Sequence, residues 1–126
     1  MRRYPISFVV LTALGALCAG ENAFLQMHTV AAVVLAARAH GAPVVPQGGN
    51  TSLCEGAVSR QGGVPAVVIN LARMRRVRAV DVVNNSLDVE AGCVLQAVQQ
   101  AAAEHGKLYP VSLGAEGSCQ IGGNIA

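Results

Sequence analysis

Apolar residues recur with a helical period in two segments of the chain. Each segment predicts a helix, and the predicted strands lie between the two. The first helix, over residues 29–40, would begin at Thr29 and end before Gly41. The second, over residues 93–105, would end before Gly106, because glycine takes the left-handed conformation at little cost. Each predicted helix carries an apolar stripe: Val30, Val33, Val34 and Ala37 in the first, and Val94, Leu95, Val98, Ala101 and Ala102 in the second.

Four short segments between these helices have the pattern of strands. Residues 43–46 and 65–71 are apolar and suit buried strands, and residues 77–82 form a further predicted strand. Residues 86–91 alternate instead, with Leu87, Val89 and Ala91 on one face and Asp88 and Glu90 on the other. The pair Asn84-Asn85 before them predicts a hairpin turn. The pattern predicts an α/β (α+β) fold, a small mixed sheet flanked by helices, whereas residues 108–126 show neither period.

The first 27 residues form a separate, irregular segment. Two arginines precede an apolar run over residues 6–19, which is the charge order of a signal peptide. The run is shorter than the roughly 20 residues that a membrane span needs. A signal, an edge helix and a misjudged gene start all remain open. We expect no stable membrane span and a cytoplasmic protein, with export still possible.

Composition supports a packed core and excludes several classes of function. The 126 residues are 52% hydrophobic and 13% charged, which suits one small domain or part of a larger one. Aromatic residues make up only 3%, so a base-stacking surface is poorly supplied and no nucleic-acid partner is expected. The basic cluster Arg73, Arg75 and Arg76 is better explained as a solvated turn. The cysteines are too widely spaced for a metal site, and we expect reduced thiols: Cys18, Cys54, Cys93 and Cys119.

A glycine-rich loop follows the predicted strand at residues 43–46, in the stretch PVVPQGGNTSLCEGA. Glycines at a strand end let successive backbone N–H groups turn towards one point, and such a nest binds anions, typically phosphate. Thr51 and Ser52 add hydroxyl donors. An ordinary turn would also explain a lone Gly-Gly. Neither a P-loop nor the dinucleotide fingerprint G-x-G-x-x-G fits the spacing.

A second loop, GAEGSCQIGGN, strengthens the case for a ligand. It supplies Ser118, Gln120, Asn124 and several glycine amides. Two such loops, each at the edge of an α/β core, suggest opposite ends of one extended ligand.

These two stretches resemble the flavin-binding domain of the vanillyl-alcohol-oxidase/p-cresol-methylhydroxylase (PCMH) type. Within it they most resemble the branch of D-2-hydroxyacid dehydrogenases, which includes D-lactate dehydrogenase, the glycolate oxidase flavin subunit and D-2-hydroxyglutarate dehydrogenase. The resemblance covers residues 28–126. The family motif continues into Thr-Asn-Ala-Gly-Gly, which this chain lacks, so we expect the N-terminal part of the domain, truncated at its C-terminal end.

The resemblance implies roles for particular residues. One group would wrap the pyrophosphate of FAD: Pro46, Gln47, Gly48, Gly49, Asn50, Thr51 and Ser52. Gly56 and Ala57 would pack against the cofactor. A third group would line the path to the isoalloxazine ring: Gly114, Ser118, Gly122, Gly123 and Asn124. Gln120 stands where many relatives have threonine. Asn50 stands where relatives with a covalent flavin have histidine, so non-covalent FAD is expected.

The implied activity is oxidation of a D-2-hydroxy acid to a 2-oxo acid, with hydride passing to the flavin. The catalytic base, the substrate clamp and the electron acceptor are not assigned to any residue or partner. His28, His40 and His105 lie at predicted helix ends, where capping or solvation is the commoner role. We expect the isolated chain to be inactive and to bind FAD weakly at best. A flavin enzyme of another substrate class, such as a sugar-nucleotide reductase, and a degenerate non-catalytic fragment are the alternatives.

Overall fold

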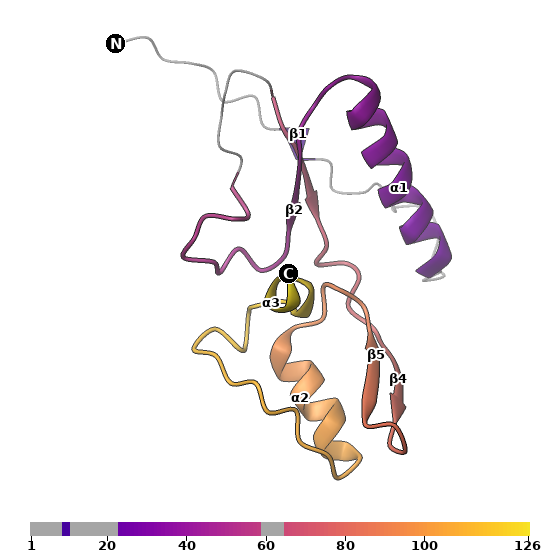
Figure 1. The fold of residues 1–126 in the computed structure, drawn as a ribbon, viewed down its shortest axis with the longest axis vertical. Helices are drawn as coiled ribbons and strands as arrows, with labels where there is room; N and C mark the ends of the chain where they lie inside the picture. The colour runs from indigo at the N-terminus through magenta and orange to yellow at the C-terminus, as the bar shows by residue number, and fades with distance from the viewer. Residues whose placement is uncertain (1–8, 11–22, 59–64) are drawn as a thin grey trace. The chain divides into compact units, whose positions relative to one another are not determined.

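The computed structural model describes residues 9–10, 23–58 and 65–126, and these fall into two compact units (Figure 1). Unit 1 holds the described residues up to Pro46 together with those in the range Glu55–Asn70. Unit 2 holds Gln47–Cys54 and Leu71–Ala126. Helices, a parallel strand pair and an antiparallel hairpin are all present, which confirms the predicted mixed α/β class.

Unit 1 contains most of a three-stranded sheet in the order β1-β3-β2. These strands are β1 (Val9–Val10), β2 (Val44–Gln47) and β3 (Val67–Asn70). β1 runs parallel to β3, with Val9 opposite Val67, and the Val67 N–H donates to the Pro43 carbonyl at 2.8 Å. The strands predicted at residues 43–46 and 65–71 are therefore confirmed. The rest of the predicted signal-like run, residues 6–8 and 11–19, lies outside the described residues.

Helix α1 (Ala23–Ala39) begins six residues before the predicted start. Thr29 therefore lies inside the helix, and its predicted role as the cap is wrong, as is the placement of His28 at a helix end. The segment before Thr29 holds no glycine or proline and is rich in good helix formers, so the helix extends through it. The end is as predicted: Gly41 has φ +64°, and the Ala42 N–H reaches back to the Ala37 carbonyl at 2.9 Å.

Unit 2 contains the predicted hairpin, formed by β4 (Val77–Asp81) and β5 (Ser86–Val89). The Asp81 carboxylate closes its turn, because Oδ1 accepts the backbone N–H groups of Val83 and Asn84, both at 2.9 Å. Asn85 supplies the left-handed residue of the turn, with φ +52°. Hydrogen bonds from the Asn84 backbone and side chain lower the pKa of Asp81 below its ordinary value of 3.8.

Helix α2 (Leu95–Glu104) packs its apolar face into the core of unit 2. Its side chains at Leu95, Val98 and Ala102 are buried, as the predicted stripe required. The core also takes in residues of the hairpin and of the segment after α2: Val77, Leu87, Val89, Cys93, Tyr109, Ala115, Cys119 and Ile121. The helix ends at His105, followed by Gly106 with φ +68°.

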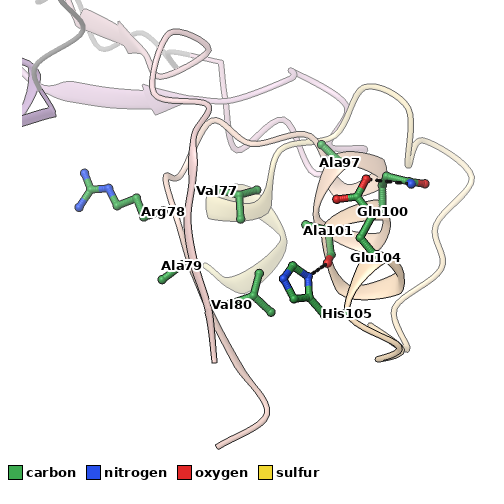
Figure 2. A pocket seen from close by; sticks show the side chains of 9 residues that line it. All are labelled: Val77, Arg78, Ala79, Val80, Ala97, Gln100, Ala101, Glu104 and His105. Atoms are coloured by element: carbon green, nitrogen blue, oxygen red, sulfur yellow. Dashed lines mark hydrogen bonds between the residues drawn. The ribbon is translucent and has the colours of Figure 1, made fainter. Parts of the chain in front are cut away.

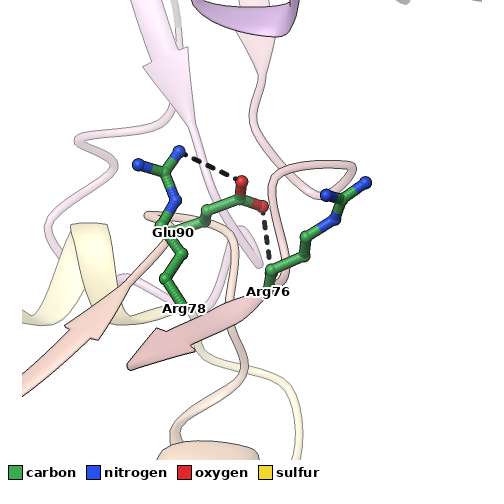
Figure 3. Close-up of polar contacts among 3 residues, drawn as sticks. All are labelled: Arg76, Arg78 and Glu90. Carbon is green, nitrogen blue, oxygen red and sulfur yellow. Dashed lines mark hydrogen bonds and ion pairs between the residues drawn. The ribbon is translucent and has the colours of Figure 1, made fainter. Parts of the chain in front are cut away.

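Glu90 is buried, although the alternation after Asn85 predicted it on the same exposed face as Asp88. β5 ends at Val89, so the strand period no longer applies at Glu90. Figure 3 shows its carboxylate held from two directions: Oε2 accepts the Arg76 N–H at 2.9 Å, and the Arg78 guanidinium donates to Oε1 at 3.2 Å. The buried charge is thus paired and hydrogen-bonded at the open end of the hairpin.

Helix α3 (Ile121–Ile125) lies in the segment for which no periodic structure was predicted. It has only five residues, of which Gly122 and Gly123 are poor helix formers. Tertiary contacts hold its start in place: the Ile121 N–H donates to the Cys93 carbonyl at 2.8 Å, and the Leu95 N–H to the Cys119 carbonyl at 3.0 Å. In the part of the chain that the structure describes, neither α3 nor any other helix is long and apolar enough to cross a membrane.

Candidate functional site

The first glycine loop, residues 48–52, follows β2 and belongs to unit 2. Its left-handed residue is Asn50, with φ +52°, whereas the sequence assigned that conformation to the glycines. Asparagine tolerates this region better than most residues. Among the described residues, the amides of residues 48–52 donate no hydrogen bond to another backbone group. The loop is therefore donor-rich, as predicted, although not through glycine dihedral angles.

The paired glycines are needed because the second loop runs directly against them. A Cβ on Gly49 would lie 2.1 Å from the Ser118 carbonyl oxygen. A Cβ on Gly48 would lie 3.3 Å from both Cβ and Oε1 of Gln120. The sequence predicted two loops at opposite ends of a ligand. The structure instead brings Gly48 and Gly49 into contact with the stretch from Ser118 to Gln120.

Gln120 contributes a buried oxygen to this contact. The residue is 8% exposed, and Oε1 has no hydrogen-bond partner among the described residues. The backbone on either side is fixed by the bridge that pairs Gln120 with Val94. A buried acceptor without a partner costs about 1–3 kcal/mol and is uncommon in folded proteins.

The amides of the second motif are used within the fold. The Gly122 N–H donates to the Ala91 carbonyl at 2.9 Å, and those of Gly123 and Asn124 donate to the Gln120 carbonyl at 3.0 and 3.2 Å. These three groups therefore do not add to an anion-binding nest, contrary to the expectation from the sequence. The Asn124 side chain donates to Cys119 Sγ at 3.5 Å, and the Ser118 hydroxyl to the Ala115 carbonyl at 3.2 Å.

Glycines outside the loop contact fall into two classes. Gly122 and Gly92 are sterically required: a Cβ on Gly122 would lie 2.8 Å from Ala91 Cβ, and one on Gly92 would lie 2.0 Å from the Leu71 carbonyl oxygen. Gly92 was not predicted, since its neighbours in space are distant in sequence. By contrast, a Cβ on Gly56, Gly114 or Gly123 would meet nothing within 4 Å in the described structure.

The other predicted site residues are mostly exposed. Thr51 and Ser52 are exposed, and Ser52 Oγ accepts the Cys54 N–H at 3.2 Å. Gln47 is half-buried and its carbonyl accepts the Leu71 N–H at 2.9 Å. Pro46, Gly56 and Ala57 belong to unit 1. The structure thus brings together the residues of the two loops that lie in unit 2.

Two hollows lie elsewhere in unit 2. One of about 450 Å³ lies between β4 and α2 and is lined by side chains that include Val77, Val80 and Ala97 (Figure 2). The His105 ring at its edge uses Nδ1 to bond the Ala101 carbonyl at 2.9 Å. A second hollow, of about 440 Å³, lies near Lys107 and Tyr109. Neither hollow is lined by a predicted site residue. The predicted site residues of unit 2 lie in the two glycine loops.

Cys93 lies next to the second loop, through the hydrogen bond between its carbonyl and the Ile121 N–H. Burial raises the pKa of the Cys93 thiol above its ordinary value of 9.0, which keeps it neutral and unreactive. No group of three or more potential metal ligands occurs among the residues that the structure describes. Free amides, two exposed hydroxyls and uncovered glycine backbone remain, and this combination suits a phosphate-containing ligand that approaches the main chain closely.

Known proteins include clear relatives of this chain. The profile of a family described as "FAD binding domain" matches residues 26–126. A D-2-hydroxyglutarate dehydrogenase of Xanthomonas citri pv. viticola is 46% identical over 101 residues, which cover 80% of this chain and 21% of that protein. The mitochondrial D-2-hydroxyglutarate dehydrogenases of Arabidopsis thaliana and Bos taurus are each 41% identical over 66% of this chain. The chain spans about a fifth or less of the length of these relatives.

Proposed function

We propose, from the premise that this chain belongs to the family of FAD binding domains, that it is the FAD-binding portion of a flavin-dependent oxidoreductase. The substrate of the whole enzyme would be a D-2-hydroxy acid, oxidised to the 2-oxo acid. The names of the three relatives support this substrate class, since each is called a D-2-hydroxyglutarate dehydrogenase. The bound FAD would accept the hydride, while the protein binds and orients it.

The observation that carries the proposal is the backbone contact of the two loops at Gly49 and Ser118. It joins the free amides of residues 48–52 to the surface that carries Gly123 and Gln120. We assign the amides, with the Thr51 and Ser52 hydroxyls, to the pyrophosphate, which is an acceptor with several oxygens. Gly114 and Gly123 would give the flavin half close access to the main chain.

The attachment of the cofactor would be non-covalent. Asn50, the residue after the paired glycines, carries an amide, and this amide is not a nucleophile. Its φ of +52° also shows that this position serves the bend of the loop. FAD should therefore leave the denatured chain on acid precipitation, and a flavin that stays with the protein would contradict this assignment.

The role of Gly123 offers a direct test. Alanine at this position meets nothing within 4 Å and favours helix α3, so Gly123→Ala should preserve or raise stability by up to about 1 kcal/mol. If the flavin approaches the main chain here, the same change should weaken FAD binding at least fivefold in a titration followed by flavin fluorescence. Gly117→Ala is the matched control, because its Cβ would make only an ordinary contact at 3.7 Å. Wild-type protein without saturable FAD binding, or equal affinity in Gly123→Ala, would refute the proposal.

A further inference from the structure

The side chain of Gln120 carries a buried hydrogen-bond acceptor, Oε1, that has no donor among the described residues. Its backbone is fixed on both sides, by the bridge to Val94 and by the Gly123 and Asn124 amides that bond its carbonyl. The residue is only 8% exposed, and Oε1 has no partner in the described structure. The backbone that carries this enclosed oxygen is therefore held in place within unit 2.

The position of Oε1 relative to the first loop points to a ligand. A Cβ on Gly48 would lie 3.3 Å from Oε1, so this oxygen lies beside the loop that holds the free amides. An apolar side chain of similar length, such as methionine, would fill the same space without an unpaired acceptor. The unpaired oxygen therefore lowers the stability of the ligand-free protein. A bound ligand that donates a hydrogen bond to Oε1 would remove this cost.

We infer that Gln120 Oε1 accepts a hydrogen bond from an N–H or O–H donor on the flavin half of FAD. This inference rests on the proposed function. Pyrophosphate oxygens at neutral pH accept hydrogen bonds and would repel Oε1. The donors of the flavin half are the imide N–H of the ring and the hydroxyls of the ribityl chain. Gln120 is thus a positioning residue that selects the flavin half, whereas the amides of residues 48–52 select phosphate.

The test is Gln120→Met in the full chain, compared with wild type and with Gln100→Met. Gln100 is an exposed control whose side chain bonds Glu104 at 3.1 Å. Two quantities are measured for each protein: the melting temperature without ligand, and the affinities for FAD and for ADP, which lacks the flavin half. A second titration with N3-methyl FAD separates the imide donor from the ribityl hydroxyls.

We expect Gln120→Met to melt about 4 °C higher without ligand, because the unpaired acceptor is gone. It should bind FAD about tenfold more weakly, and its affinity for ADP should change less than twofold. In wild type, a tenfold loss with N3-methyl FAD assigns the imide, and no loss assigns a ribityl hydroxyl. Either result supports the inference.

Three outcomes overturn it. A lower melting temperature or unfolding of Gln120→Met means that the oxygen already has a partner in the chain. Equal FAD affinity means that no ligand group uses it. An equal loss for ADP means that the contact lies in the adenosine or phosphate half. In all three, wild type still binds FAD and the proposed function stands, whereas absence of FAD binding by wild type refutes both.

Discussion

At the scale of single residues, glycine is retained in this chain for different physical reasons. At Gly41 and Gly106 the backbone is left-handed, with φ +64° and +68°. At Gly49 and Gly92 another segment occupies the space of a side chain, with carbonyl oxygens 2.1 and 2.0 Å from the Cβ position. At Gly123 neither reason applies, because its φ is not positive and a Cβ there would meet nothing within 4 Å. A glycine of this third kind is not explained by the fold, and we attribute it to a ligand.

Gly49→Ala should therefore destabilise the chain, because the new methyl group requires the two loops to separate. We expect a loss of about 3 kcal/mol in the free energy of unfolding, measured by urea denaturation. Gly114→Ala, whose Cβ would meet nothing within 4 Å, should change it by less than about 0.5 kcal/mol. Equal stability of the two variants would contradict the loop contact.

Residue types identified the candidate loops from the sequence, but not how their residues are used. The stretch Gly-Gly-Asn-Thr-Ser predicts a flexible, donor-rich turn from its residue types alone. That Gly49 abuts Ser118, and that the Gln120 oxygen lies beside Gly48, depends on segments about 70 positions apart in the chain. Gly92 likewise depends on Leu71 and Met74, which lie outside its local sequence.

At the scale of elements, the hairpin is the best example of local determination. Its turn is closed by Asp81, whose carboxylate accepts hydrogen bonds from the Val83 and Asn84 backbones within three residues. Alternation in β5 and the pair Asn84-Asn85 predicted it correctly. α3 and β1 were not predicted, since each is only a few residues long and depends on pairing with a distant segment.

The hairpin turn makes stability depend on pH in a defined direction. Hydrogen bonds from Asn84 hold the pKa of Asp81 below 3.8, so the ionised carboxylate stabilises the folded state. This contribution is present above pH 3.8 and is lost as the pH falls through the lowered folded-state pKa. Asp81→Asn should be less stable than wild type at pH 7, and the difference should shrink below pH 4 in thermal melts.

Asp88→Asn is the matched control, because Asp88 lies on the exposed side of the same hairpin. It should melt close to wild type at both pH values. A difference between Asp81→Asn and wild type that stays constant down to pH 2.5 would show that the carboxylate charge does not hold the turn.

At the scale of the whole molecule, several large apolar side chains face solvent. Leu35 in α1 is 64% exposed, and Leu108 after α2 is 84% exposed. Others in the described part include Leu53, Val83 and Ile125. Isolated exposed apolar residues are ordinary, but this number on a short chain favours self-association.

The double change Leu35→Gln and Leu108→Gln should accordingly slow aggregation at least twofold, followed by light scattering, with an unchanged circular dichroism spectrum. Neither side chain contributes to the buried core, so folding should tolerate both changes. Leu95→Gln is the contrasting variant: this side chain is 0% exposed, and a polar group there should unfold unit 2. Aggregation as fast as in wild type would show that other surfaces drive association.

The three kinds of glycine should also change at different rates in proteins that evolve from this chain. A lineage that keeps the fold but no longer needs its flavin should still reject side chains at Gly49, Gly92 and Gly122, where the protein itself fills the space. Gly114 and Gly123 would drift first, together with Gln120, whose unpaired oxygen would then be only a burden. The order in which these positions change would therefore date the loss of the cofactor relative to the loss of the fold.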